Sequence, residues 1–348
     1  MPANPIYLDH AATTPLLPQA LAAMQDGWAA WANPSSPHAA GRAARAAFED
    51  ARARLKAVLD WQGEVIFTSG ASEALALAIG RAKAGQVLVS AVEHDAALRA
   101  AGQAERLLVG ADGAVDLNGL ETHLNGTDRA LSVVQQVNSE TGVMQDMGAV
   151  ADLVQAAGGV LLCDAAQGAG KIQLPPADMV VISAHKFGGP VGAGALLVRD
   201  YGLLEPTGGQ ERGYRGGTEA LPLVLGMVAA LEAGAAWMAQ AAALRDMLEV
   251  ELVASGAEVI AAGAPRIATI GAYRMPGKSS AAQLIRFDGA GIAVSAGSAC
   301  SSGSLKPSHV LTAMGVEGLS EVIRVSIGRE TTEADIARFV ALWREIRG

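Results

Sequence analysis

Short apolar runs alternate, up to about residue 200, with longer segments in which alanine and leucine recur at helical spacing. The longer segments, such as 72–84, 95–104 and 147–158, predict helices. Alternation of this type is typical of βα units around a mostly parallel sheet with helices on both faces. The sequence therefore predicts an α/β fold. The runs that predict its strands are 64–69, 86–91, 131–137, 160–165, 179–185 and 194–199.

The pattern changes after Gly217. One long helical stretch is predicted from there to about Ser255, and a final helix is predicted to start near Thr332. We predict a large domain at 15–244 and a smaller α+β domain formed by 1–14 and 245–348, with the extended N-terminal residues packed onto it. The other elements expected in the smaller domain are strands at 258–263, 266–272 and 321–328 and a helix at 279–287.

Composition and charge exclude several classes of protein. With 348 residues, 51% hydrophobic and 18% charged, the chain is expected to be globular with a large core. A net charge of −9, without a basic cluster, argues against nucleic-acid binding. The sequence contains no apolar segment typical of a signal peptide or a membrane span, so a cytoplasmic protein is expected, with its two cysteines, Cys163 and Cys300, as free thiols.

Polar residues that are suited to catalysis or ligand binding follow several of the predicted strands. In a parallel α/β sheet, ligands collect at the carboxyl ends of the strands. Lys186 follows one strand beside the glycine-rich "FGGPVGAG" and is a candidate for Schiff-base chemistry, although a surface lysine is an alternative. Asp164 ends another strand, where it can pair with a protonated pyridine nitrogen or cap a following helix.

Two further strand ends extend this set. In "FTSGASEALALA" a strand, a glycine turn and a helix start can hold a phosphate with help from Ser72, unless Ser69 or Ser72 serves only as a helix cap. His94 can stack on a planar ring or transfer a proton, although a lone histidine often has only a structural role. Pyridoxal phosphate requires an amine, a carboxylate, a phosphate-binding turn and a side chain that stacks on its ring, and these strand ends supply all four.

Ordered motifs run along nearly the whole chain. They are "YLDHAATTP", "NPSSPHAAGRAAR", "FTSGASEALALA", "EHDA", "VNSETGVMQ", "DAAQGAGK", "SAHKFGGPVGAGALLVR", "GGQERGYRGGTEA", "SAGSACSS" and "IRVSIGRETTEADI". Together they resemble the cysteine desulfurases, in the class V aminotransferase group, and "SAGSACSS" resembles the subgroup in which the cysteine lies on a longer mobile loop. The resemblance implies the fold of fold-type I pyridoxal-phosphate-dependent transferases.

The resemblance also implies roles for residues around the cofactor. Lys186 would carry pyridoxal phosphate as a Schiff base and move protons at the substrate α-carbon, while His94 would cover the ring. Asp164 would pair with the pyridine nitrogen and Gln167 would contact the ring hydroxyl. Thr218 would reach the phosphate of the other subunit, which implies a homodimer. The rest of the cofactor-binding set is Ala71, Ser72, Ser183 and His185.

Substrate contacts are implied for a second group. Arg324 would bind the substrate carboxylate with its planar, charged fork, with a surface salt bridge as the alternative. Asn138 and Ser139 complete this group, but the family pattern has asparagine where this chain has Ser139. A shorter hydroxyl would reach the substrate only through water, so weaker or different substrate binding is expected there.

The reaction implied by the resemblance converts L-cysteine to L-alanine and leaves the sulfur on Cys300 as a persulfide. Small, flexible neighbours suit a thiol that must meet both the substrate and an acceptor, such as an iron–sulfur scaffold. Cys163, inside a predicted strand, is expected to be a buried hydrophobe. No metal site is expected. Transamination, selenocysteine cleavage and a non-catalytic interaction protein remain alternatives, whereas a nucleotide-binding oxidoreductase requires a G-x-G-x-x-G turn that "TSGASEA" lacks.

Overall fold

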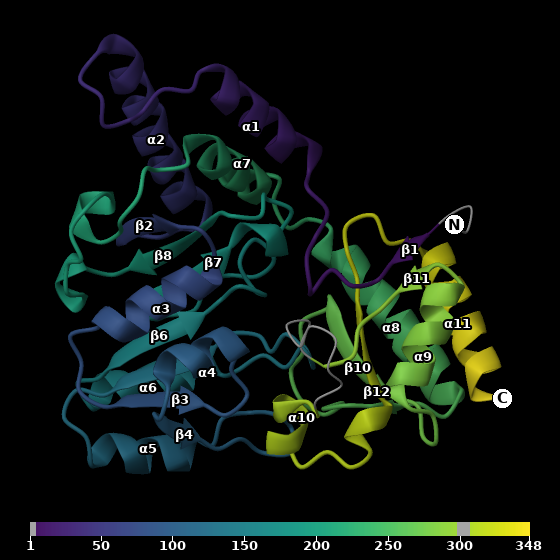
Figure 1. The fold of residues 1–348 in the computed structure, drawn as a ribbon. Coiled ribbons are helices and arrows are strands. Elements are labelled where there is room, and N and C mark those ends of the chain that lie inside the picture. Colours follow the sequence, from purple (N-terminus) through teal and green to yellow (C-terminus); the bar gives the residue numbers. More distant parts are fainter. Residues whose placement is uncertain (1–4, 298–306) are drawn as a thin grey trace.

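The computed structural model describes residues 5–297 and 307–348, which form two lobes, each built on its own sheet (Figure 1). The larger lobe contains a seven-stranded sheet in the order β2-β8-β7-β6-β5-β3-β4. Its strands are β2 (Glu64–Thr68), β3 (Val87–Ser90), β4 (Glu105–Leu107), β5 (Leu131–Gln135), β6 (Val160–Asp164), β7 (Met179–Ser183) and β8 (Gly194–Val198).

Strand directions in this sheet are mostly parallel. Only β8 is reversed, since it runs antiparallel to both β7 and β2, whereas β7, β6, β5, β3 and β4 pair in parallel. The predicted α/β fold with a mostly parallel sheet is therefore confirmed. Strand β4 was not predicted, because Glu105–Leu107 is too short to show an apolar period.

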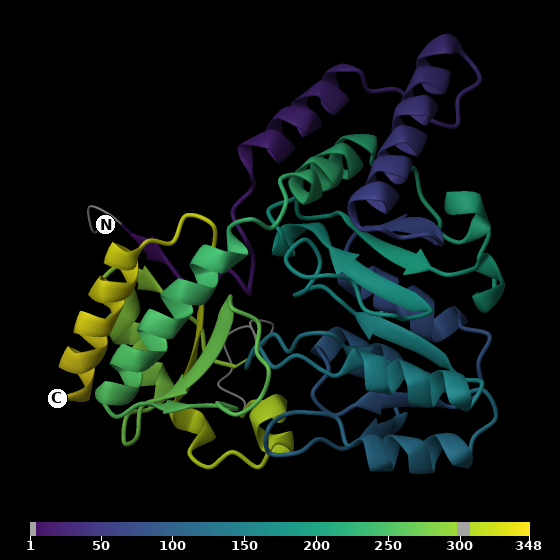
Figure 2. The ribbon, with the colours of Figure 1, turned by 180° about the vertical axis from the view of Figure 1, so that it is seen from behind.

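Helices cover both faces of the large sheet (Figures 1 and 2). Alternate residues of one strand face opposite layers, so that Val181 packs with α3 (Ala71–Arg81) and α4 (Asp95–Ala101), while Val180 faces the other way. The helices of that second layer are α1 (Pro18–Ala29), α2 (Ala39–Val58), α5 (Leu117–Asn125), α6 (Met147–Ala156) and α7 (Leu221–Glu232).

The smaller lobe contains an antiparallel sheet in the order β12-β10-β9. A separate parallel pair joins β1, near the N-terminus, to β11. The strands are β1 (Ile6–Tyr7), β9 (Glu258–Val259), β10 (Ile270–Arg274), β11 (Ile292–Ala293) and β12 (Val322–Ser326). The helices are α8 (Met238–Ala254), α9 (Ser280–Gly289), α10 (His309–Ala313) and α11 (Glu333–Arg347).

The N-terminal segment belongs to the core of the smaller lobe. Ile6 and Leu8 pack in one cluster with Leu248, Phe287 and Trp343, which come from α8, α9 and α11. The pairing of β1 with β11 therefore joins the N-terminal segment to a strand in the last fifth of the chain (Figure 1).

The single long helix predicted after Gly217 is wrong. The structure has two helices, because α7 ends at Glu232 and α8 begins at Met238. Gly234 lies between them with φ of 70°, a conformation that glycine adopts readily and that ends helices. Helix α8 runs through residue 244, where the sequence analysis divided the chain into domains. Within the described part of the chain, no helix is long and apolar enough to cross a membrane.

Candidate active site

A cavity of ≈ 440 Å³ lies where the parallel strands of the large sheet end, a volume typical of small-molecule sites. Both lobes contribute to its wall, since Arg324 comes from β12 and the other predicted residues come from the larger lobe. Most of the predicted site residues line the cavity: Ala71, Ser72, His94, Ser139, Asp164, Gln167, Ser183, His185, Lys186 and Arg324.

Lys186 is placed by a short 3-10 turn, η1 (Ala184–Lys186), that directly follows β7. Its Nζ donates hydrogen bonds to the carbonyl oxygens of Ala11 and Ala12, at 2.7 and 2.9 Å. Ala11 and Ala12 also line the cavity. No side-chain pattern predicts this role for the two alanines, although both lie in the "YLDHAATTP" motif.

Asp164 is the last residue of β6, and it is 7% exposed. Its Oδ1 accepts a hydrogen bond of 2.9 Å from the Ala166 N–H, and the residues that follow form turns, so it does not cap a helix. Burial raises the pKa of Asp164, while the Ala166 N–H, His94 and Lys186 act in the opposite direction. A cationic group beside this carboxylate would stabilise its charged form.

Glu93 is a buried carboxyl group that the sequence analysis missed. It is fully buried, and its Oε1 accepts a hydrogen bond of 2.6 Å from the Gln135 N–H. Burial, followed by the nearby charge of Asp164, raises its pKa well above the usual range. The burial of Glu93 therefore disfavours a second negative charge beside Asp164.

His94 combines a structural contact with a place in the cavity wall. It is the N-cap of α4, where its Nδ1 accepts a hydrogen bond of 3.1 Å from the Ala96 N–H. Burial lowers its pKa, and the charge of Asp164 opposes this effect. Gln167 lies nearby in the same wall, and its Nε2 donates a hydrogen bond of 2.9 Å to the Ala11 carbonyl.

The turn before α3 has the geometry of an anion site. Gly70 is the N-cap with φ of 151° and provides no side-chain cap, so capping by Ser69 or Ser72 does not occur. A Cβ atom on Gly194 of β8 would lie 2.6 Å from the Gly70 Cα, so the turn and this strand approach each other closely. The first N–H groups of a helix have no partners within it and attract anions.

His185 borders the same end of the cavity. Its Nδ1 lies 3.1 Å from the Thr13 hydroxyl. Burial, with the charges of Lys186, His94 and Lys171, lowers its pKa to about 4, so the ring is neutral near pH 7. A neutral ring donates one hydrogen bond to an anion without adding charge.

These residues fit pyridoxal phosphate. The cavity brings together an amine, a carboxylate, a helix start with hydroxyl groups, and an imidazole. In addition, Gln167 Oε1 is buried without a hydrogen-bond partner among the described residues. Lys186 would hold the cofactor covalently, and the turn at 70–72 with Ser183 and His185 would hold its phosphate.

The buried guanidinium of Arg324 forms an ion pair with Asp9, which is partly exposed. Arg324 is 3% exposed, its Nη2 lies 2.7 Å from Asp9 Oδ1, and its Nη1 donates a hydrogen bond of 2.9 Å to the Ser139 carbonyl. The alternative of a surface salt bridge therefore does not apply. Because Arg324 lines the cavity, a carboxylate bound there would compete with Asp9 for the guanidinium.

The structure does not bring Asn138 to the cavity wall. Its Nδ2 donates to the Val92 carbonyl at 3.1 Å, and its Oδ1 accepts from the N–H groups of Glu140 and Thr141, each at 2.9 Å. These bonds satisfy the side chain and fold the turn after β5, so Asn138 has a structural role. Ser139 lines the cavity instead.

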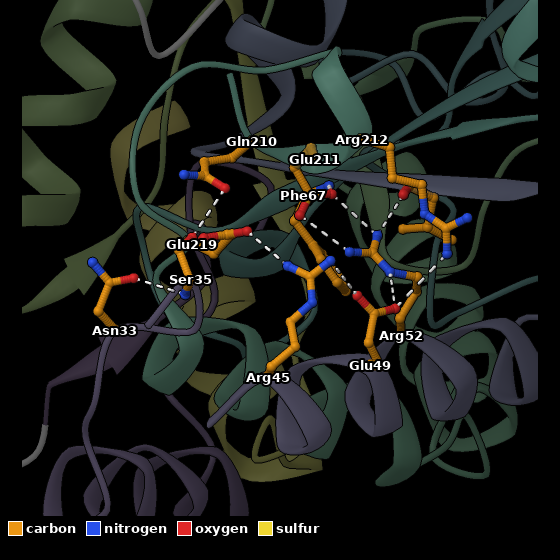
Figure 3. Close-up of polar contacts among 11 residues, drawn as sticks. Asn33, Ser35, Arg45, Glu49, Arg52, Phe67, Gln210, Glu211, Arg212 and Glu219 are labelled. Carbon is orange, nitrogen blue, oxygen red and sulfur yellow. Dashed lines mark hydrogen bonds and ion pairs between the residues drawn. The ribbon is translucent and has the colours of Figure 1, made fainter. Parts of the chain in front are cut away.

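Thr218 is exposed and does not line this cavity. Two buried carboxylates anchor the segment that carries it to α2 (Figure 3). Glu211 binds Arg52 through two contacts of 3.1 Å, and Glu219 binds Arg45 at 3.1 Å. Glu211 also accepts a hydrogen bond of 2.8 Å from the backbone N–H of β2, at residue 67, so the segment is fixed to both α2 and the sheet.

Cys300 lies within 298–306, outside the described residues. The chain on both sides of this gap contacts the site. Ser295 pairs with Arg324 through two backbone hydrogen bonds, and His309 Nε2 lies 2.8 Å from the Glu93 carbonyl, next to His94. Cys163 is a free, buried thiol whose pKa burial raises, as expected of a core residue.

Comparisons with known proteins show which family the chain belongs to. The family described as "Aminotransferase class-V" matches residues 6–339. The chain is 36% identical over 371 residues to a cysteine desulfurase of Rhodobacter capsulatus, covering 98% of this chain and 96% of the relative. It is 37% identical over 365 residues to a cysteine desulfurase of Klebsiella pneumoniae, covering 97% and 91%. Among solved structures, a NifS-like protein from Rickettsia africae superimposes with a TM-score of 0.91 at 29% identity, covering 99% of both chains.

Proposed function

Because the chain belongs to the class V aminotransferase family, and membership of this family implies dependence on pyridoxal phosphate, we propose that the protein is a cysteine desulfurase. It converts L-cysteine to L-alanine and transfers the sulfur to Cys300 as a persulfide. Support comes from relatives of that description that match nearly the full length of the chain.

One observation carries the proposal: Lys186, Asp164, His94 and Arg324 line a single cavity, although three separate stretches of the larger lobe and one strand of the smaller lobe supply them. The first three suit a ring cofactor. Arg324 adds a group that recognises the carboxylate of an amino acid.

Bound pyridoxal phosphate supplies an electron sink that weakens the bonds to the substrate α-carbon. The Lys186 amine accepts the α-proton and later returns a proton to the product. Asp164 stabilises a protonated ring nitrogen by charge. His94 covers the ring, while Arg324, held beside Ser139, orients the substrate carboxylate.

Cys300 is the sulfur acceptor in this proposal. Its thiolate attacks the substrate sulfur, so a new S–S bond forms as the C–S bond breaks, and the electrons of the C–S bond remain with the carbon skeleton. Protonation of that skeleton yields L-alanine. The balance is one L-cysteine and one thiol converted to one L-alanine and one persulfide, without an external oxidant. The persulfide then passes its sulfur to an acceptor protein such as an iron–sulfur scaffold.

The proposal includes a homodimer, in which Thr218 reaches the phosphate site of the other subunit. Exposed apolar side chains on and near α1 support such an interface, namely Leu16, Leu21, Trp28 and Trp31. Their packing against a second copy would remove apolar surface from water.

The test measures sulfide and alanine formed from L-cysteine in the presence of a reductant. Cys300→Ser and Lys186→Ala should both abolish formation of the two products, and only the first should keep the absorbance of the bound cofactor. Cys163→Ala is the matched control for loss of a thiol and should keep activity.

Alanine formation that survives Cys300→Ser would show that this thiol is not the acceptor. Amino-group transfer to a 2-oxo acid by that variant would instead support an aminotransferase. Parallel assays with L-selenocysteine separate a desulfurase from a selenocysteine lyase.

A further inference from the structure

Glu73 is a charged residue of the large cavity that the mechanism proposed above does not use. It lies in the first turn of α3, directly after Ser72, and lines the cavity beside the proposed phosphate turn. Its Oε2 accepts a hydrogen bond of 2.5 Å from the Ser69 N–H, which holds the carboxylate against the turn at 69–73. A carboxylate therefore lies beside the helix start that is proposed to hold a phosphate.

Arg215 forms an ion pair with this carboxylate. Its Nε donates to Glu73 Oε1 at 2.9 Å, and its Nη2 lies 3.4 Å from Oε2. The two side chains are only 20% and 31% exposed. Burial opposes ionisation of Glu73, but the hydrogen bonds from Arg215 and from the Ser69 N–H outweigh it and lower the pKa of the carboxyl group. Among the described residues, Glu73 forms no other ion pair.

The other carboxylates beside Arg215 already have partners. A small cavity of ≈ 30 Å³ is lined by Arg215, Glu211 and Glu219. Glu211 and Glu219 are paired with arginines of α2 (Figure 3). The charge of Arg215 is therefore directed to Glu73, from a segment that is 142 positions away in the chain.

The side chains proposed to hold the cofactor phosphate are themselves uncharged. Ser72, Ser183 and Thr218 provide hydroxyl groups, and burial lowers the pKa of His185 to about 4. A phosphate monoester carries a charge of about −1.5 to −2 near pH 7. An unpaired Glu73 carboxylate beside this group would repel it, because like charges at short range disfavour each other.

We propose that Arg215 is a positioning residue for the cofactor phosphate, because its pairing with Glu73 cancels a negative charge at the turn that must accept a dianion. Glu73 binds the Ser69 N–H, which precedes the N-cap, so the first N–H groups of α3 stay available to the phosphate. The inference rests on the proposed function only for the identity of the cofactor.

The test compares pyridoxal phosphate with pyridoxal, which lacks the phosphate group. The full-length chain, freed of cofactor, is titrated with each compound, and binding is followed by the absorbance of the bound aldehyde. Arg215→Met should raise the Kd for pyridoxal phosphate at least about fivefold and change the Kd for pyridoxal by less than about twofold. Arg212→Met is the matched control, because it removes an arginine of the same segment that is 51% exposed, and it should change neither Kd.

Two further variants separate the charge of the pair from its shape. Glu73→Gln keeps an oxygen for the Ser69 N–H, and it should bind pyridoxal phosphate at least as tightly as the wild type. Combined with Arg215→Met, it should restore the Kd to within about twofold of the wild-type value. Arg215→Lys keeps the charge, so its Kd should lie closer to that of the wild type than the Kd of Arg215→Met does. If Arg215→Met does not fold, as judged by circular dichroism, Arg215→Gln is the second uncharged variant.

Equal weakening of both compounds in Arg215→Met would overturn the proposal, because the ion pair would then only maintain the fold. An unchanged Kd for pyridoxal phosphate would also overturn it. So would a double variant as weak as Arg215→Met, since the effect would then come from displacement of the segment that carries Thr218. A selective loss of pyridoxal phosphate affinity in a protein that forms no sulfide from L-cysteine would support the role of Arg215 and contradict only the proposed reaction.

Discussion

Asp9 and Arg324, 315 positions apart in the chain, form an ion pair of 2.7 Å, and Arg324 lines the cavity. The same guanidinium is the group proposed to bind the substrate carboxylate. Asp9 therefore competes with the substrate, and it keeps the buried Arg324 charge paired when no substrate is bound.

Asp9→Asn should lower the KM for L-cysteine several-fold with little change in kcat, because a neutral side chain competes less for Arg324. The variant should also unfold at a lower temperature. Its stability cost should remain below the ~3–5 kcal/mol of an unpaired buried charge, because asparagine still accepts a hydrogen bond. Steady-state kinetics and thermal unfolding check both parts, and an unchanged or increased KM would contradict the competition.

Asp164→Asn should reduce kcat/KM by about two orders of magnitude, equivalent to about 2.7 kcal/mol of transition-state stabilisation. The amide keeps the size of the side chain and an oxygen for the Ala166 N–H, but it cannot stabilise a protonated ring nitrogen. The measurement pairs kinetics with the absorbance of the bound cofactor. Full activity in this variant would remove Asp164 from the proposed role.

Glu211→Gln should destabilise the larger lobe, but by less than the ~3–5 kcal/mol of an unpaired buried charge, because the Arg52 guanidinium, which is 5% exposed, keeps its ion pair with Glu49. Urea unfolding measures the loss. The double variant Arg52→Met with Glu211→Gln should lose less stability than the sum of the two single variants. Additive losses would show that the two side chains do not act as a pair.

Lys171→Met should increase stability most at low pH. The folded pKa of Lys171 is about 7, below that of an unfolded lysine, so the unfolded chain binds more protons between pH 7 and pH 10. The stability cost of this lysine is therefore complete below pH 7 and fades as pH rises. Urea unfolding at pH 6.5, 8 and 9.5 should show the advantage of Lys171→Met shrinking step by step, and a constant advantage would contradict the burial of the charge.

The sequence predicts the large sheet well because its strands are continuous apolar runs that are buried on both faces. It also predicts the residues at strand ends, such as Lys186 and Asp164, since parallel topology brings these ends to one edge. The structure places both in the cavity wall. The two-residue strands β1 and β11 could not be predicted, because a run of that length carries no period.

Contacts between distant parts of the chain were also beyond the sequence analysis. Ala11 and Ala12 meet Lys186 through backbone oxygens, to which side-chain patterns give no clue. The pairing of Asp9 with Arg324 depends on how the N-terminal segment packs beside β12 within the smaller lobe. Asn138 belongs to a motif shared with the cysteine desulfurases, yet its side chain is hydrogen-bonded within its own turn. Only these hydrogen bonds distinguish a structural role from a substrate contact.

The parallel pairing of β1 with β11 has a consequence for biosynthesis. A ribosome makes Ile6 and Leu8 first, but their packing partners in α9, β11, β12 and α11 emerge only as translation nears its end. These apolar residues must remain exposed to solvent or to a chaperone while the central sheet assembles. A chain that ends before β12 would leave these residues without part of their packing partners. The nascent chain therefore completes the Asp9–Arg324 contact, and with it the cavity wall, as one of its last folding events.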